Sequence, residues 1–218
     1  LEHLASLGLP LSDRKEVEFG AGVGDPPSFY LDRQCEILAT DARSSNLDLM
    51  RMRLMHHPGI DRLRTECLNV EEPFDLVEQF DIVHCYGLLY HVARAKDALA
   101  QMARHCKELF LLETKTDPRP LADESYGRES PDEAYHSFSG TNFRPTRQWL
   151  HAAMKTHFPF VYWPVTQPSH EEFPIDFGNV TSVPDGWPRA VLIGSRQALA
   201  NDLLLEAPPP TYAPSWPF

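Results

Sequence analysis

The sequence predicts an α/β fold built around a mostly parallel sheet. Through the first half of the chain, short apolar runs alternate with amphipathic stretches, which is the pattern of successive βαβ units. A glycine-rich turn follows the first apolar run, as it does in many sheets of this kind. The composition is that of a globular protein, with 42% hydrophobic and 23% charged residues in 218. A chain of this length suits one domain, so we expect residues 1–218 to form a single unit.

The first half contains the more regular elements. Two helices are expected in this half. Pro58 and Gly59 end the first, and in the second apolar residues recur at helical spacing from Val92 to Met102. We expect strands at 16–20, 36–41, 64–68, 80–86 and 108–113, and helices at 44–56 and 92–105.

The second half is less regular. Residues 115–142 are rich in Pro, Ser, Asp, Glu and Gly without a period, which is typical of a functional lid. Residues 166–188 form a second polar, proline-rich stretch, and five prolines after Glu206 exclude a helix or central strand there. We therefore expect a core of about 10–114 and 143–196, lids at about 115–142 and 166–188, and a tail at 207–218. In the second part of the core, we expect a helix at 145–157 that begins with a first-turn proline, and strands at 160–165 and 190–195.

Charge and cysteine content exclude several classes of function. The formal net charge of −11 argues against a broad grip on the phosphates of nucleic acid. No apolar run approaches the ~18 residues that span a bilayer. The four cysteines form no CxxC pair, so we expect reduced thiols, a cytoplasmic location and no structural zinc.

The sharpest local signal is the turn after the first strand, Glu18-Phe-Gly20-Ala-Gly22-Val-Gly24. Glycines at alternate positions let the backbone bend tightly and approach a ligand closely. Their spacing, G-x-G-x-G, differs from the G-x-G-x-x-G of dinucleotide-binding folds. The carboxylate of Glu18 suits a ligand that carries an ammonium group. Asp41 ends the second strand, where an acid can accept hydrogen bonds from ribose hydroxyls.

These residues resemble the motifs of the class I S-adenosylmethionine-dependent methyltransferases. The glycine turn resembles the first motif of that superfamily, and Asp41 matches its acidic ribose-binding position. Residues 69–71 fall where the family often has an Asp and an apolar residue flanking the adenine, and 80–92 resembles its fourth-strand motif. The resemblance covers roughly residues 10–196. This chain departs from the pattern with Asn69 in place of Asp and with Pro26-Pro27 in the helix after the glycine turn.

The resemblance implies a three-layer Rossmann-like fold with a seven-stranded sheet and S-adenosyl-L-methionine as the cofactor. Methyl transfer is an in-line displacement, so catalysis comes from positioning, exclusion of water and, for a hydroxyl acceptor, removal of a proton. The cofactor-binding residues expected from the resemblance are Glu18, Gly20, Ala21, Gly22, Gly24, Asp41, Ala42, Asn69, Val70 and Tyr86.

Two residues are candidates for catalysis. His91 lies just beyond the fourth strand, and an unperturbed histidine pKa near 6.5 suits a general base; a histidine that only caps or packs the next helix is the alternative. Glu113 ends the fifth strand and could orient an acceptor hydroxyl, or be a solvated strand end. The acidic cluster around His170 lacks the spacing of a metal site. In the lids and at their borders, we expect substrate contacts from Tyr126, His136, Arg144 and His170, although solvated loop residues would look the same.

The function that these observations favour is methylation of a hydroxyl on a small molecule or carbohydrate. The main alternative is a catalytically silent S-adenosylmethionine-binding module that serves as a partner subunit. A nicotinamide-dependent oxidoreductase is a third interpretation, which the glycine spacing disfavours. The acceptor and the oligomeric state are left open by the sequence.

Overall fold

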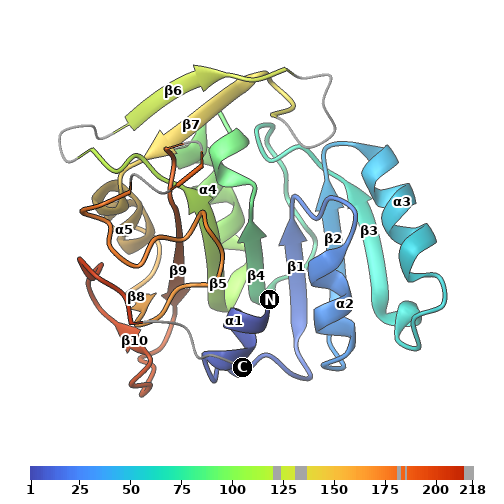
Figure 1. Ribbon diagram of the computed structural model, residues 1–218. Helices are drawn as coiled ribbons and strands as arrows, with labels where there is room; N and C mark the ends of the chain where they lie inside the picture. The colour runs from blue at the N-terminus through green and yellow to red at the C-terminus, as the bar shows by residue number, and fades with distance from the viewer. Residues whose placement is uncertain (120–123, 131–136, 181–182, 185, 214–218) are drawn as a thin grey trace.

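A computed structural model describes residues 1–119, 124–130, 137–180, 183–184 and 186–213. Its body is an eight-stranded sheet with helices on both faces (Figure 1). The strand order across the sheet is β10-β8-β9-β5-β4-β1-β2-β3. Strands β1 to β5 are parallel to one another, and β9 runs antiparallel to both β5 and β8. The strands of the sheet are β1 (Lys15–Phe19), β2 (Glu36–Asp41), β3 (Leu63–Cys67), β4 (Phe80–Tyr86), β5 (Cys106–Lys115), β8 (Phe160–Pro164), β9 (Arg189–Ser195) and β10 (Leu204–Leu205).

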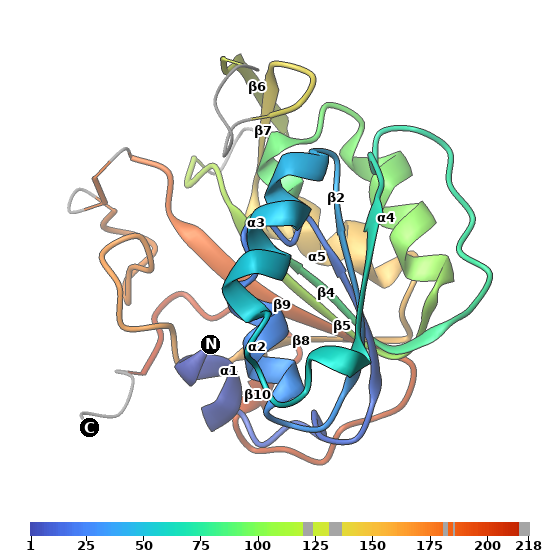
Figure 2. The same cartoon turned by 90° about the vertical axis from the view of Figure 1, so that its right-hand side faces the viewer.

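The helices divide between the two faces (Figure 2). One hydrophobic cluster joins the sheet to α1, α2 and α3, and another joins it to α4 and α5. The central strands are therefore covered on both sides, which explains why β5 is apolar almost without alternation. The helices are α1 (Glu2–Ser6), α2 (Asp25–Leu31), α3 (Ser44–Leu54), α4 (Ala95–Arg104) and α5 (Arg147–Lys155), with 3₁₀ turns η1 (Ile60–Arg62) and η2 (Leu89–His91).

The topology fixes where a ligand can bind. From β1 the chain builds outward through β2 to β3, then returns to place β4 on the other side of β1. This reversal makes a switch point between β1 and β4, and in open α/β sheets a crevice forms there at the carboxyl ends of the strands. The three-layer α/β fold predicted from the sequence is confirmed, with β10 as an eighth strand at one edge.

Several element boundaries differ from those predicted. The helix expected from residue 92 begins at Ala95, and the preceding residues form η2. The helix expected from Pro145 begins at Arg147, because Thr146 caps it with a side chain that accepts from the Trp149 N–H at 3.1 Å. Pro145 instead ends strand β7. The helix α2 is the short helix after the glycine turn that the resemblance implies; its prolines lie in the first turn, where a missing N–H costs no hydrogen bond.

The first lid region contains structure that the sequence did not reveal. Strands β6 (Glu124–Arg128) and β7 (Thr141–Pro145) pair as an antiparallel hairpin above the sheet (Figure 1). In the described part of the second lid, residues 166–180, 183–184 and 186–188, there is neither helix nor strand, but isolated bridges join Thr166 to Ala213 and Asp176 to Thr211. Within the described residues, no helix is both long and apolar enough to cross a membrane.

Candidate active site

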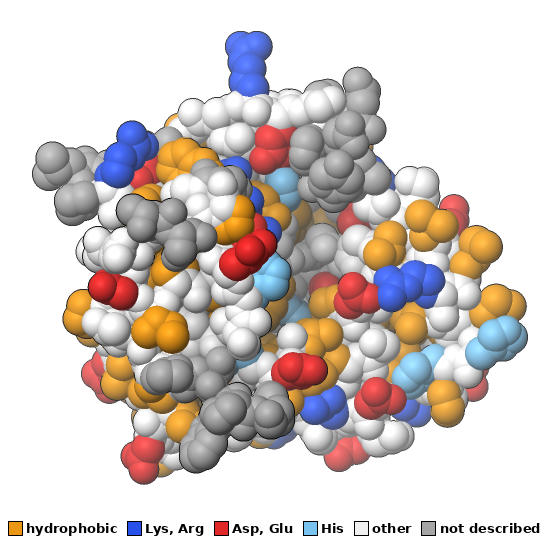
Figure 3. All heavy atoms as spheres, in the orientation of Figure 1, with side chains coloured by type: hydrophobic (Ala, Val, Ile, Leu, Met, Phe, Trp, Pro, Cys, Tyr) orange, Lys and Arg blue, Asp and Glu red, His pale blue; other side chains and the backbone are white. Residues whose placement is uncertain are grey.

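A cavity of about 400 Å³ lies at the switch point of the sheet. It opens on the face shown in Figure 3 as a hollow below the hairpin. Its walls come from the carboxyl ends of four neighbouring strands and from the hairpin connection. They are the glycine turn after β1, residues 41–46 after β2, residues 68–71 after β3, residues 87–92 after β4, and Phe138.

The glycines of the first turn have different roles. Gly20, Gly22 and Gly24 all have positive φ, at 74°, 53° and 94°, where other residues are strained. A Cβ built on Gly22 meets no protein atom within 4 Å, so this position borders open space. A Cβ on Gly24 would lie 2.5 Å from Cγ of Met50 in α3. Gly22 therefore leaves room for a ligand, whereas Gly24 lets the turn pack against a helix.

Asp41 fastens the glycine turn to the end of β2. One carboxylate oxygen accepts the Gly22 N–H at 3.0 Å, and the other accepts the Arg43 N–H at 2.8 Å and the Asn46 side-chain amide at 3.1 Å. A carboxylate offers about four acceptor positions, so three donors leave capacity for another. Asp41 lines the cavity and can bind a ligand hydroxyl while still holding the turn.

Glu18 lies behind the turn, with only 2% of its surface exposed. One of its carboxylate oxygens has no hydrogen-bond partner among the described residues. Burial, and then the nearby charges of Asp41 and Asp25, raise the pKa of Glu18 well above its usual range. A cationic group bound near the turn would offset both effects.

His91 belongs to the turn after β4 and lines the cavity. Its Nδ1 lies 2.5 Å from a carboxylate oxygen of Glu129, which follows strand β6. Burial alone would raise the pKa of Glu129, but the Ser137 N–H, the imidazole of His91 and the guanidinium of Arg144 together lower it. The Ser137 N–H donates to Glu129 at 2.9 Å, and Arg144 lies 3.5 Å away. An ionised carboxylate thus faces the histidine ring.

A second polar network lies beside this pair and is centred on Arg189. Its guanidinium donates to both oxygens of Glu113 at 3.0 and 3.2 Å, to Glu172 at 2.9 Å and to the Tyr90 hydroxyl at 3.0 Å. Burial raises the pKa of Glu113, with Arg189 opposing the shift. The ring of Tyr90 lies between the guanidiniums of Arg189 and Arg144, at 4.9 and 5.1 Å from its centre.

The residues expected to bind the cofactor divide into two groups. Those on the cavity wall are Gly20, Gly22, Asp41, Ala42, Asn69 and Val70. Those behind the wall are Glu18, Ala21, Gly24 and Tyr86; both Tyr86 and Glu18 have side-chain oxygens without a partner among the described residues. Of the two catalytic candidates, His91 lines the cavity, and Glu113 is ion-paired away from it.

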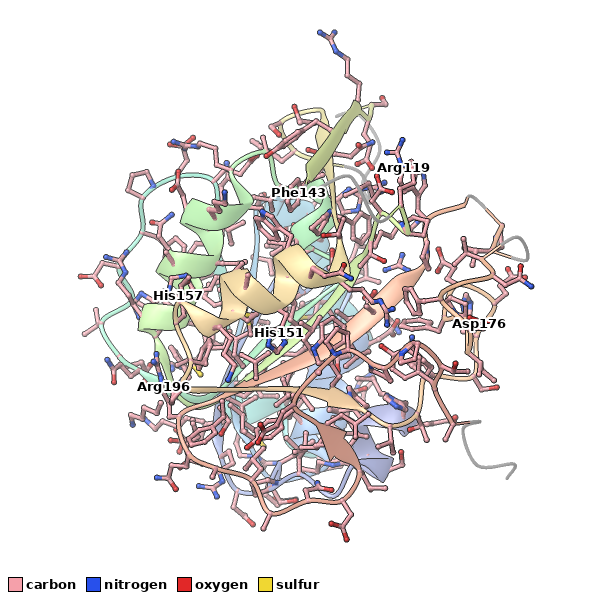
Figure 4. The ribbon with its side chains drawn as sticks, turned by 90° about the vertical axis from the view of Figure 1, so that its left-hand side faces the viewer. Arg119, Phe143, His151, His157, Asp176 and Arg196 are labelled. Carbon is pink, nitrogen blue, oxygen red and sulfur yellow. The ribbon has the colours of Figure 1, made fainter. Side chains whose placement is uncertain are left out.

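The residues expected to touch the acceptor are not brought together. Arg144 is buried and donates to the Tyr90 carbonyl at 3.0 Å. Tyr126 is half-exposed on β6, with its ring 5.2 Å from that of Phe143. His170 lies exposed in the second lid, and His136 lies outside the described residues. Figure 4 shows Phe143, which belongs to β7 of the hairpin, well apart from Asp176 on the loop that follows His170.

Two residues of the site were not predicted from the sequence. Glu129 lies 38 positions from His91 in an aperiodic stretch, so only the folded hairpin shows that they pair. Phe138 reaches the cavity from the same hairpin, yet half of its surface stays exposed. No local signal marks either one. In the described part of the chain, no group of three or more His, Cys, Asp or Glu side chains could hold a metal ion.

The cavity lies at the switch point of an open α/β sheet, which is where such folds bind nucleotide cofactors. Residues 17–108 match the family model described as a methyltransferase domain. This match covers less than half of the chain; together with the shared fold it supports the class I S-adenosylmethionine-dependent methyltransferase superfamily.

Solved structures share this fold at low sequence identity. The N-terminal domain of EvdMO1, solved in the presence of SAH and D-fucose, is 21% identical with a TM-score of 0.68, and the match covers 84% of this chain and 76% of that one. The glycopeptide N-methyltransferase MtfA is 16% identical with a TM-score of 0.61, covering 90% and 88%. An S-adenosylmethionine-dependent methyltransferase from Mesorhizobium loti is 13% identical with a TM-score of 0.62, covering 89% and 96%. No curated protein matches the sequence.

Proposed function

We propose that the protein methylates a hydroxyl group of a small molecule or carbohydrate, with His91 as the general base. The observation that carries the proposal is the contact between His91 and the buried carboxylate of Glu129 at the wall of the cavity. S-adenosylmethionine, when bound, supplies a methyl group on a sulfonium centre.

The residues present fit this cofactor. The cavity of about 400 Å³ falls in the range of small-ligand sites. Gly22 leaves the open space that a closely approaching ligand requires, and Asp41 retains acceptor capacity for ribose hydroxyls. Asn69 and Val70 lie on the wall where they can flank the adenine. The orphan oxygen of Glu18 suits the ammonium group of the methionyl part.

The pair of His91 and Glu129 is arranged for proton removal. The ionised carboxylate accepts the Nδ1 proton of His91, which fixes the tautomer and makes Nε2 the basic nitrogen. Arg144 holds Glu129 and also the backbone of Tyr90, so it keeps the base and its partner in register. An alcohol is a poor nucleophile until its proton leaves, and a positioned base typically contributes ~10²–10⁴-fold.

We assign Glu113 a positioning role instead of the catalytic role that the sequence predicted for it. Its carboxylate is held by Arg189, which also binds the Tyr90 hydroxyl. Glu113 therefore fixes the turn that carries His91. Contacts of Tyr126, His136 and His170 with the acceptor stay predictions.

A carbohydrate suits the surroundings of His91. The ring of Tyr90 lines the cavity, and Trp187 lies near the guanidiniums of Arg119 and Arg144 at 5.9 and 5.8 Å from the ring centre. Aromatic rings beside charged hydrogen-bonding groups offer both an apolar surface and polar partners. The name of one structural neighbour mentions D-fucose, which supports a sugar acceptor, whereas another is named a glycopeptide N-methyltransferase, so the test must include amines. The four free cysteines support a reducing, cytoplasmic location.

The test is methyl transfer to a panel of acceptors that carry hydroxyls or amines, with His91→Ala as the main variant. We expect the transfer rate to fall by ~10²–10⁴-fold, while the affinity for S-adenosylhomocysteine stays nearly unchanged. Glu129→Gln keeps the shape of the pair but removes the charge, so it should lower the rate by a smaller factor. His56→Ala, an exposed histidine at the end of α3, is the matched control.

The pH dependence gives a second readout. The rate should rise with pH as the imidazole of His91 loses its extra proton, because only the neutral ring accepts a proton. A flat profile between pH 5.5 and 8, with chemistry rate-limiting, would contradict a histidine base. Transfer only to amines would contradict the hydroxyl acceptor and leave the methyltransferase assignment intact.

A further inference from the structure

The sheet ends at β3, which has one neighbour, β2, among the described residues. The Leu68 N–H donates to the Asp41 carbonyl in β2. Because backbone groups alternate sides along a strand, Thr65 and its neighbours two residues away direct their N–H and C=O groups outward. An open edge of this kind is a template for another strand.

The helix beside this edge exposes three large apolar residues. The inner side of α3 buries Leu47, Met50 and Leu54 against the sheet. The outer side carries three large apolar residues, with 50, 67 and 59% of their surfaces exposed, at Leu49, Met52 and Met55. Helices α4 and α5 instead keep their apolar residues on one side. Apolar residues on both sides are expected of a helix that is covered on both sides.

The edge strand is complementary to itself. Arg64 and Glu66 flank Thr65 and are both exposed. If two copies of β3 pair antiparallel about Thr65, Arg64 of each copy lies opposite Glu66 of the other. Such opposite charges at directly facing positions stabilise a strand pair. Any parallel arrangement in the same register would place Arg64 beside a second Arg64.

We propose that two copies of this chain associate through β3, antiparallel about Thr65, to form a twofold dimer with one continuous sheet. The occupant of the edge is thus a second copy, and the interface is isologous. Thr65 faces α3, since Arg51 of that helix donates to its hydroxyl, so the ion pairs lie on the opposite face of the sheet.

The outer side of α3 fits the same arrangement. This helix packs on both β2 and β3, so it lies roughly one strand spacing from the twofold axis. Two copies of α3 would then lie about two spacings apart, or roughly 10 Å, which is the distance at which helices pack side by side. In Figure 1 the right-hand side of the molecule carries β3 and α3, and Figure 2 looks onto that side. Met55 follows Arg51 by four residues and so lies on the same flank of α3, which faces the partner, and the dimer therefore covers it.

Charge reversal tests the pairing register. Size-exclusion chromatography with light scattering should give the wild-type chain twice the monomer mass of 24.8 kDa at micromolar concentrations. Arg64→Glu alone and Glu66→Arg alone should each weaken the dimer at least tenfold, because each places like charges opposite one another twice. The double variant R64E/E66R should restore it.

Mixing the two single variants is the most specific test of the pairing register. The R64E chain then carries an acid at both positions, and the E66R chain carries a base at both. Every facing pair across the mixed interface therefore joins opposite charges, so a one-to-one heterodimer should form from two monomers. Misfolding cannot produce that result.

A control separates the edge from a contact within the chain. Arg64 also contacts Glu78, so R64E is repeated with Glu78→Gln, which removes the repulsion inside the monomer and should leave the dimer just as weak. A wild-type chain that stays at 24.8 kDa, or a dimer that neither reversal weakens, would overturn the proposal.

Discussion

Several titratable side chains on β1 and β4 are buried without partners among the described residues. Neither carboxylate oxygen of Glu16 has a hydrogen-bond partner among the described residues. Burial, and then the charge of Glu18, raise the pKa of Glu16 well above its usual range. His84 has both ring nitrogens without a partner, and burial lowers its pKa to about 3. The rings of Tyr30 and Tyr86 contact His84 at 5.4 and 4.2 Å. These residues form a polar core below the glycine turn.

Glu16 costs the protein stability at neutral pH. Replacing it with Met, which has a similar volume, removes a buried carboxyl that lacks partners. We expect Glu16→Met to raise the free energy of unfolding at pH 8 by roughly 1–3 kcal/mol. Urea unfolding of both proteins measures it, and Glu16→Gln separates the loss of charge from the loss of polarity. A less stable Glu16→Met chain would indicate that buried water satisfies the carboxyl.

Gly22 tests the cofactor assignment. Gly22→Val places a branched side chain in the open space beside the turn, so affinity for S-adenosylhomocysteine should fall by at least tenfold in calorimetry. Valine at positive φ also costs stability. Gly8→Val is the matched control, since Gly8 has φ of 64° and no atom within 4 Å of a Cβ, but lies in a separate cleft with residues 198–203. Equal affinity in a folded Gly22→Val chain would contradict the assignment.

At the scale of elements, the hairpin of β6 and β7 joins the two halves of the site. The residue after β6, Glu129, pairs with His91, and Phe138 before β7 lines the cavity. The guanidinium of Arg43, in the cavity wall after β2, lies 5.5 Å from the ring centre of Phe138. One element therefore contacts both the proposed base and the proposed cofactor site.

The hairpin should contribute to cofactor affinity through Phe138. Phe138→Ala removes a ring that covers the cavity, and we expect binding of S-adenosylhomocysteine to weaken by about tenfold, equivalent to ~1.4 kcal/mol. Tyr126→Ala truncates another half-exposed ring of the same hairpin that is not in the cavity wall, so it should leave this affinity unchanged. Equal losses in both variants would mean that the effect comes from the hairpin's stability.

At the scale of the whole molecule, buried acids and buried histidines act on stability in opposite directions. The pKa values of Glu16 and Glu18 are raised in the folded chain, so their favourable contribution is complete below about 4.5 and is lost as the pH rises. The pKa values of His3 and His84 are lowered to about 4 and about 3, so their contribution is complete above about 6.5 and is lost as the pH falls.

The free energy of unfolding should therefore pass through a maximum in mildly acidic solution and fall on both sides. Denaturant melts between pH 3 and 9 measure the curve. Glu16→Met should flatten the alkaline side and leave the acid side in place. A wild-type curve that rises steadily to pH 9 would contradict the raised pKa values of the two glutamates.

The sequence alone predicted most of the sheet, the glycine turn and the residues of the proposed cofactor site. Apolar runs such as Leu109–Leu112 in β5 can be buried only in a sheet covered on both faces, so the pattern fixes the element type locally. The turn at Gly22 and the acid at Asp41 were predictable for the same reason, since each depends on backbone geometry at one strand end.

Only the tertiary structure decided how the acceptor side is built. Glu129 and His91 are far apart in sequence and meet because the hairpin folds over the turn after β4. Glu113 looked like a free carboxylate at a strand end, but Arg189 from an antiparallel neighbour neutralises it. Side chains that meet through long loops leave no periodic trace, because their spacing depends on the path of the whole chain. The proposed cofactor half of the site could therefore be predicted from local sequence, whereas the proposed catalytic half could be recognised only in the fold.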